Sequence, residues 1–159
     1  KSLAGFISAG VNNSVSLTAD TTLTVDAHAG KILLCNDADG KFTLPSIVTT
    51  TPSDPTDPNQ TNNIGATFNF YIETAATDLD IKTDGTDKFK GAILIAVDDG
   101  AKKAFVPGAS NDVITMNGST KGGIVGSIVS FTAIDTATYL VHSSLLIGSG
   151  TIVTPYADA

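Results

Sequence analysis

The 159-residue chain contains no arginine, no tryptophan, one cysteine and one glutamate. Its nine lysines face sixteen acidic residues, which gives a formal net charge of -7. This balance argues against nucleic-acid binding, because phosphate neutralisation depends on clustered cationic side chains. A lone cysteine excludes an internal disulfide bond, and no Cys/His spacing indicates a zinc site. The longest apolar run, 92–97, falls far short of the roughly 20 residues that cross a bilayer, so no membrane span is expected.

Residues that favour helix interiors are also scarce, with a single Glu, Gln and Met, whereas Thr, Val and Ile are abundant. Several segments alternate apolar and polar residues, which is the pattern of a half-buried strand. The clearest is 66–73, in which Ala66, Phe68, Phe70 and Ile72 share one face. We therefore expect an all-β protein, an antiparallel β-sandwich of jelly-roll type with extended termini.

Other segments carry similar signals. Alternation over 15–19 and 23–27 predicts one or two strands, and the runs 32–35 and 42–44, joined through Asp39 and Gly40, predict a hairpin. No internal repeat of fixed period is evident, which disfavours a solenoid. Further strands are expected at 79–81, 92–97, 104–106, 113–116, 124–132, 138–143 and 145–147.

The sequence predicts one domain between two extended ends. Residues 1–14 form an N-terminal arm, 15–147 the β-sandwich domain, and 148–159 a C-terminal tail. Segment 49–63 contains three prolines and no apolar residue, so we interpret it as a long surface loop. Both ends contain apolar side chains outside the sandwich pattern. They are either edge strands or frayed termini, or arms that attach to a neighbouring subunit or a shell.

Short motifs along the chain resemble a β-rich module that recurs in virion proteins of tailed phages. The module has a Leu-Thr start, a Gly-Lys strand, a Thr-Leu-Pro strand end, a glycine-containing loop and an aromatic strand. The residues that carry the resemblance are Leu17–Asp20, Ala29–Cys35, Asp39, Gly40, Phe42–Pro45, Gly65, Phe68, Phe70, Ile72, Thr83–Gly91, Gly126–Ile128, Phe131 and Thr138–Val141.

Proteins with this module include capsid decoration (cement) proteins and parts of head fibres and tail fibres, generally assembled as homotrimers. The resemblance therefore implies a bacteriophage structural protein located in the virion. We expect a homotrimeric decoration protein on the outer surface of the capsid, bound to the major capsid protein, with Leu3, Phe6 and Ile7 of the arm as capsid contacts. The alternatives are a head-fibre or tail-fibre receptor-binding module, and a secreted β-sandwich that binds sugar or calcium. No heptad pattern for a fibre shaft is present.

Residues for catalysis are few. His28 and His142 are the only histidines. His28 lies near Asp26 and Cys35 in sequence, but a catalytic triad needs side chains that converge from separate elements. We therefore predict that the protein is not an enzyme and that it uses no cofactor.

Paired aspartates in turns are the best candidates for metal ligands. Asp is equally a common turn residue that accepts local backbone hydrogen bonds, and the EF-hand spacing is not met. We therefore expect no metal site. The pairs are Asp37 and Asp39, Asp78 and Asp80, Asp84 and Asp87, and Asp98 and Asp99.

Overall fold

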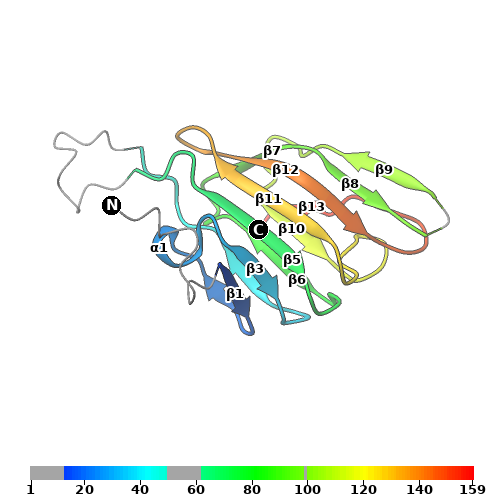
Figure 1. Ribbon diagram of the computed structural model, residues 1–159. Coiled ribbons are helices and arrows are strands. Elements are labelled where there is room, and N and C mark those ends of the chain that lie inside the picture. The colour runs from blue at the N-terminus through cyan, green and yellow to red at the C-terminus, as the bar shows by residue number, and fades with distance from the viewer. Residues whose placement is uncertain (1–12, 50–61, 99) are drawn as a thin grey trace, which may run out of the picture.

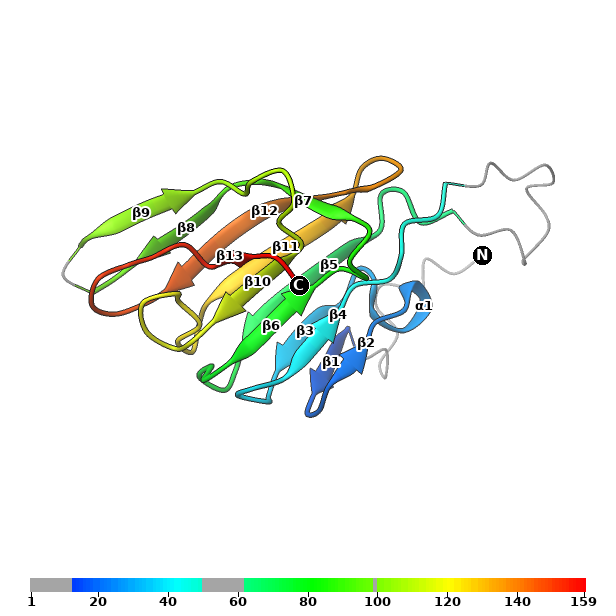
Figure 2. The same ribbon diagram turned by 180° about the vertical axis from the view of Figure 1, so that it is seen from behind.

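The computed structural model describes residues 13–49, 62–98 and 100–159. These residues form a mostly-β protein in which two mixed sheets pack face to face (Figure 1), and the view from behind shows the smaller sheet (Figure 2). A single one-turn helix, α1 (Val25–His28), is present among them. Within the described ranges, no helix has the length and hydrophobicity of a membrane-crossing segment.

The larger sheet contains eight strands. They are β1 (Ser14–Leu17), β3 (Ile32–Cys35), β5 (Thr67–Ile72), β7 (Lys88–Gly91), β8 (Ile93–Ala96), β9 (Lys102–Phe105), β11 (Ile128–Ala133) and β12 (Thr138–Ile147). Their order is β1-β3-β5-β11-β12-β8-β9, and β7 pairs with the first half of β12. The second half of β12 pairs with β8 instead.

The smaller sheet contains five strands. They are β2 (Thr21–Thr22), β4 (Lys41–Thr43), β6 (Leu79–Lys82), β10 (Val113–Met116) and β13 (Tyr156–Ala157). Their order is β13-β10-β6-β4-β2. The last strand belongs to the segment 148–159, so the C-terminal tail adds an edge strand to this sheet and buries Ile152 and Tyr156 against it.

The expectation of a purely antiparallel sandwich is wrong, because six of the eleven pairings between the described strands are parallel. Strands β1, β3 and β5 run parallel in the larger sheet, and β2, β4 and β6 run parallel in the smaller one. Each of β1, β3 and β5 is followed along the chain by a strand of the smaller sheet, β2, β4 and β6 respectively. Residues 14–82 therefore form three stacked units, each a strand, an arch across the core and a second strand.

This stacking is solenoid-like, although the sequence shows no repeat of fixed period. The connection from β2 to β3 covers residues 23–31, whereas that from β4 to β5 covers 44–66. Because the units return by connections of such different length, they leave no fixed period in the sequence.

The hairpin predicted from 32–35 and 42–44 is also wrong. Strands β3 and β4 lie in different sheets, and the turn at Asp39 and Gly40 carries the chain across the core between them. A hairpin and an arch both place alternate side chains in the core, so the apolar pattern of the sequence does not distinguish them. Gly40 is buried at this crossing, where an added Cβ would lie 2.7 Å from the ring of Phe42.

The strand predicted over 23–27 is replaced by α1. Leu23 is buried, and its neighbour Thr24 is the N-cap of the helix, accepting a hydrogen bond from the backbone N–H of Ala27 at 3.4 Å. Thr is a favourable N-cap because its hydroxyl satisfies a backbone donor in the first turn. The extended backbone ends at this cap, although the alternation in the sequence continues to Ala27.

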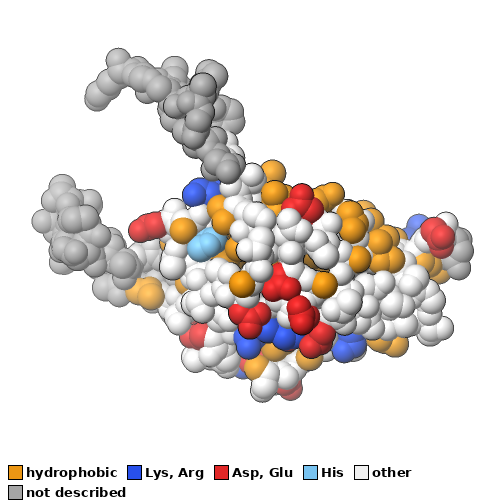
Figure 3. Space-filling view, turned by 90° about the horizontal axis from the view of Figure 1, so that it is seen from below, with side chains coloured by type: hydrophobic (Ala, Val, Ile, Leu, Met, Phe, Trp, Pro, Cys, Tyr) orange, Lys and Arg blue, Asp and Glu red, His pale blue; other side chains and the backbone are white. Residues whose placement is uncertain are grey.

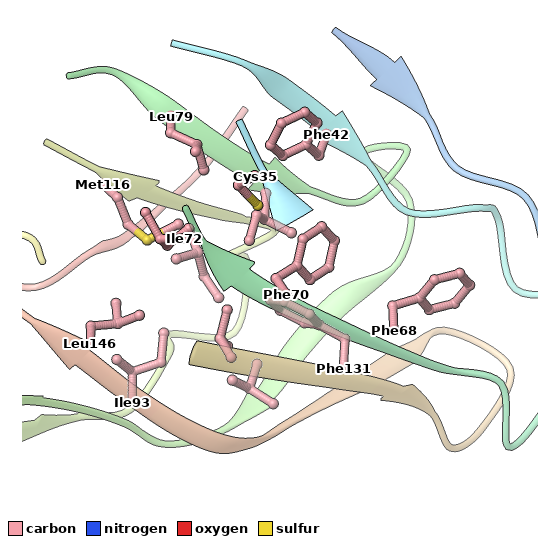
Figure 4. Close-up of a cluster of buried hydrophobic side chains, with 14 of the residues drawn as sticks. Cys35, Phe42, Phe68, Phe70, Ile72, Leu79, Ile93, Met116, Phe131 and Leu146 are labelled. Carbon is pink, nitrogen blue, oxygen red and sulfur yellow. The ribbon is translucent and has the colours of Figure 1, made fainter. Parts of the chain in front are cut away.

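The core between the sheets is rich in phenylalanine (Figure 4). The ring centroid of Phe70 lies 6.3 Å from that of Phe42 in the smaller sheet and 5.6 Å from that of Phe131 beside it. Phe89 continues the contact, 5.2 Å from Phe131. Burial of each such side chain contributes about 1.5–3 kcal/mol, so this chain of rings is a main source of stability.

Strand β12 changes partner at an irregularity. Ser143 has a positive φ of 47°, and the hydroxyl of Ser144 donates to the carbonyl of Ala92, between β7 and β8, at 2.7 Å. Gly91 ends β7 with a φ of 103°, and a Cβ at this position would collide with the carbonyl oxygen of Val141. The close approach of the two backbones therefore requires glycine at position 91.

We predict that Gly91→Ala destabilises the protein far more than Gly85→Ala. Gly85 has a similar φ of 92° but open space around its Cα, so that variant bears only the cost of the backbone conformation, about 1–2 kcal/mol. Gly91→Ala must in addition displace a strand, which should bring its loss of unfolding free energy above about 3 kcal/mol. Urea denaturation at one protein concentration measures both, and equal losses would contradict the prediction.

Candidate assembly surface

A continuous row of aliphatic and aromatic side chains crosses the outer face of the larger sheet. Among its members, the exposed fraction is 42% for Ile128, 41% for Leu145 and 36% for Leu94. This set is called the apolar row below. From β3 to β9 it consists of Leu34, Tyr71, Ile128, Leu145, Leu94 and Ala104, each paired in register with the next.

The alternation of each strand explains why these side chains point outward. Leu33 and Phe70 are buried in the core, so their neighbours Leu34 and Tyr71 face the other way. In β12 the irregularity at Ser143 shifts the alternation, so that Leu146 enters the core and Leu145 faces outward. Without this shift the row would be interrupted at β12.

Polar side chains beside the row are hydrogen-bonded to one another. The Thr132 hydroxyl lies 2.7 Å from the Thr67 hydroxyl and 2.8 Å from Nε2 of His142. The Ser130 hydroxyl, on the same outer side of the sheet but only 8% exposed, donates to the side-chain oxygen of Asn69 at 2.9 Å. These groups are therefore satisfied within the face itself.

The two outer faces differ in charge. None of the eight strands of the larger sheet, all within the described ranges, contains Asp or Glu. On the smaller sheet, Lys41 Nζ lies 3.0 Å from the carboxylates of both Asp78 and Asp80. In Figure 3 the larger sheet's outer face is at the upper edge, where hydrophobic side chains gather with a few acidic atoms among them, while most acidic and lysine side chains lie together in the lower half.

The proposed capsid contacts Leu3, Phe6 and Ile7 lie outside the described residues. Of the residues considered for catalysis, Cys35 is fully buried in β3, and burial raises the pKa of its thiol well above the usual range. Helix α1, which carries His28, has no buried residue. The structure therefore does not gather these groups into one site.

The paired aspartates Asp84 and Asp87 hold the chain where β4 leads into segment 49–63. Asp84 accepts a hydrogen bond from the Ser46 hydroxyl at 2.6 Å, and Asp87 accepts one from the backbone N–H of Ile47 at 2.9 Å. The Tyr139 hydroxyl donates to the carbonyl of Pro45 at 2.6 Å. These contacts fix the base of the segment, which gives the pair a structural role.

The remaining aspartate pairs belong to no metal-like cluster within the described residues. Asp78 and Asp80 share Lys41, and Asp99, the partner of Asp98, is not among the described residues. Over 13–49, 62–98 and 100–159, no cluster of three or more His, Cys, Asp or Glu side chains is placed to hold a metal ion.

The pKa values of Asp84 and Asp87 shift in opposite directions. Burial raises the pKa of Asp87, and the nearby charge of Asp84 adds to this effect. Burial acts on Asp84 as well, but hydrogen bonds from the Ser46 hydroxyl and from backbone N–H groups, among them that of Thr86, outweigh it and lower its pKa. Ionised Asp84 therefore favours folding, and ionised Asp87 opposes it.

No family model, curated protein or solved structure matches this chain. Its function must therefore be argued from its own residues.

The feature that sequence reasoning missed is the apolar row, because the row depends on the register of five strand pairings. The available signal was the presence of apolar runs at 32–35, 92–97 and 145–147 that continue over both faces of a strand.

We predict that Asp87→Asn stabilises the protein at pH 7 and that Asp84→Asn destabilises it. The asparagine at position 87 can still accept the Ile47 hydrogen bond but carries no buried charge. The Asp87→Asn difference should shrink as the pH falls through the raised pKa of Asp87 to the usual aspartate pKa. The Asp84→Asn difference should shrink only as the pH falls further, from the usual aspartate pKa toward the lowered pKa of Asp84. Thermal unfolding between pH 3 and pH 7 tests this, and effects of the same sign at pH 7 would contradict it.

Proposed function

We propose that this chain is a non-enzymatic structural protein of a bacteriophage virion. In this role it is a capsid decoration protein, bound as a homotrimer to the major capsid protein on the outer surface of the head, which it stabilises. The apolar row is the observation that carries the proposal. Contiguous exposed apolar patches on soluble proteins mark interaction surfaces, and a row across six strands is such a patch.

The motifs that resemble the phage module support the same role. The Leu-Thr start falls at the end of β1, the Gly-Lys strand is β3, and the Thr-Leu-Pro motif ends β4. The aromatic strand is β5. The motifs thus follow the order of the stacked units in residues 14–82, so the resemblance covers a continuous structural part of the chain.

The N-terminal arm is proposed as the attachment to the shell. The backbone N–H of Ile32 donates to the carbonyl of Asn13 at 2.9 Å, which ties the start of the sandwich to β3. Residues 1–12 precede this anchor and lie outside the described residues. Leu3, Phe6 and Ile7 would supply apolar contacts with the major capsid protein.

Three arms on one trimer would act together. Once one arm is bound, the others are held near their own sites, and this effective concentration strengthens attachment without any new contact. Ordering a flexible segment costs roughly 1–2 kcal/mol per residue, so apolar burial alone would not hold an arm. Backbone hydrogen bonds formed by strand addition would supply the remainder.

We predict that deletion of residues 1–12 leaves the protein folded and trimeric but reduces its occupancy on undecorated expanded capsids. Occupancy is compared by co-sedimentation over a dilution series, where the loss should grow with dilution because attachment through three arms is cooperative. A full-length variant with Leu3→Ser, Phe6→Ser and Ile7→Ser keeps the length of the arm but removes its apolar contacts. It should lose occupancy as the deletion does, which assigns the loss to these three side chains.

Equal occupancy of all three proteins at every dilution would show that the arm is not the attachment. Binding of the wild type to host cells but not to capsids would instead identify a receptor-binding fibre module.

A further inference from the structure

We infer that the apolar row is the surface through which copies of this chain pack against one another. The occupant of the row is a second copy of the same chain. This inference rests on the proposed homotrimer and adds to it the face at which its subunits meet.

The distribution of charge favours a second copy. Two chains that each carry a net charge of -7 repel one another least when they meet through a face with few acidic groups. The strands of the larger sheet provide such a face, since their only charged side chains are those of Lys88, Lys90, Lys102 and Lys103. The Lys41, Asp78 and Asp80 cluster on the smaller sheet then points away from the contact.

The polar groups beside the row lower the free-energy cost of removing water from this face, because they are already hydrogen-bonded to one another. Burial of an unpaired hydroxyl or amide in an interface costs free energy, because its hydrogen bonds to water are lost. The Thr67, Thr132 and His142 side chains already bond to one another, as do those of Ser130 and Asn69. A second copy can therefore cover these side chains while their hydrogen bonds to one another stay intact.

The length of the row is close to the width of a standard protein–protein interface. Strands in a sheet lie about 4.8 Å apart, so the row, from β3 to β9, is roughly 24 Å long. A standard interface buries about 800 Å² per partner, which corresponds to a patch roughly 28 Å across. That area is about a tenth of the 8168 Å² surface of this chain. Flanking side chains such as Ile32, which is 52% exposed, widen the band.

Closed symmetry then brings the rows together. In a ring of three subunits, equivalent residues of the copies surround one axis, and a face turned toward that axis meets the same face of its neighbours. Apolar side chains of the row can then pack around that axis against the same rows of both neighbours.

The test compares Ile128→Lys with Ile134→Lys. Both residues are isoleucines with similar exposed fractions, 42% and 45%, but Ile134 lies in the turn after β11 and outside the row. Each substitution brings the net charge from -7 to -6, so weaker association cannot result from greater overall repulsion. Light scattering across micromolar concentrations should show Ile128→Lys dissociating at a concentration at least tenfold higher than the wild type, with Ile134→Lys unchanged. Leu145→Lys, on the neighbouring strand, should repeat the effect.

A second measurement uses smaller changes that keep the fold. In Ile128→Cys and Ile134→Cys, the introduced thiols can be alkylated while Cys35, buried and with a raised pKa, is not. In the assembled protein the thiol at position 128 should react at least tenfold more slowly than that at 134. Equal rates would overturn the inference, as would a wild type that is monomeric at micromolar concentration.

The same variants separate this inference from the proposed function. An Ile128→Lys protein that stays trimeric but loses capsid binding would show that the row faces the shell, which overturns the inference and leaves the decoration role standing. A wild-type trimer that the row variants dissociate, but that does not bind capsids, would support the inference and refute the decoration role.

Discussion

The structure depends on the closure of two sheets over one set of aromatic side chains. Phe70 lies at the centre, between Phe42 of the smaller sheet and Phe131 of its own. Because successive strands of the first half supply residues to both walls of this core, the chain must cross from sheet to sheet after each strand. Arches follow from this requirement, and arches stacked in one direction give parallel neighbours in both sheets. The mixed topology is thus a consequence of how the core is filled, strand by strand.

Filling the core from both sides leaves two outer faces, and they differ in what they can do. The face of the smaller sheet carries Lys41 between two aspartates, a side suited to water. The face of the larger sheet carries the apolar row and a polar network that is satisfied internally. The irregularity at Ser143 contributes to both sides, since it directs Leu146 into the core and Leu145 into the row. Packing inside the sandwich and the composition of its surface are therefore set by the same backbone feature.

Much of the strand content could be predicted from alternation alone, as in β5, where Phe68, Phe70 and Ile72 are all buried. Alternation does not record which sheet a strand joins, and so 32–35 and 42–44 suggested a hairpin where an arch exists. It also could not locate the helix after Leu23, because the alternation continues to Ala27 and only the cap at Thr24 starts the helix. The apolar row was beyond sequence reasoning for a related cause. Each member is ordinary in its own strand, and only the register places Ile128 between Tyr71 and Leu145.

A protein with two open β-sheets can associate with other molecules through its outer faces or through its sheet edges. Open sheet edges are the usual route, since their unpaired backbone groups accept strands from other molecules. Here β2 and β13, the edges of the smaller sheet, have two residues each, and β9 presents Lys102 and Lys103 at one edge of the larger sheet. Short edges and lysine side chains both oppose strand addition. The acidic residues, gathered in turns and around the smaller sheet, repel approach from those directions. Approach through the face whose strands lack acidic residues meets the least repulsion, and this is the surface that the proposed assembly uses.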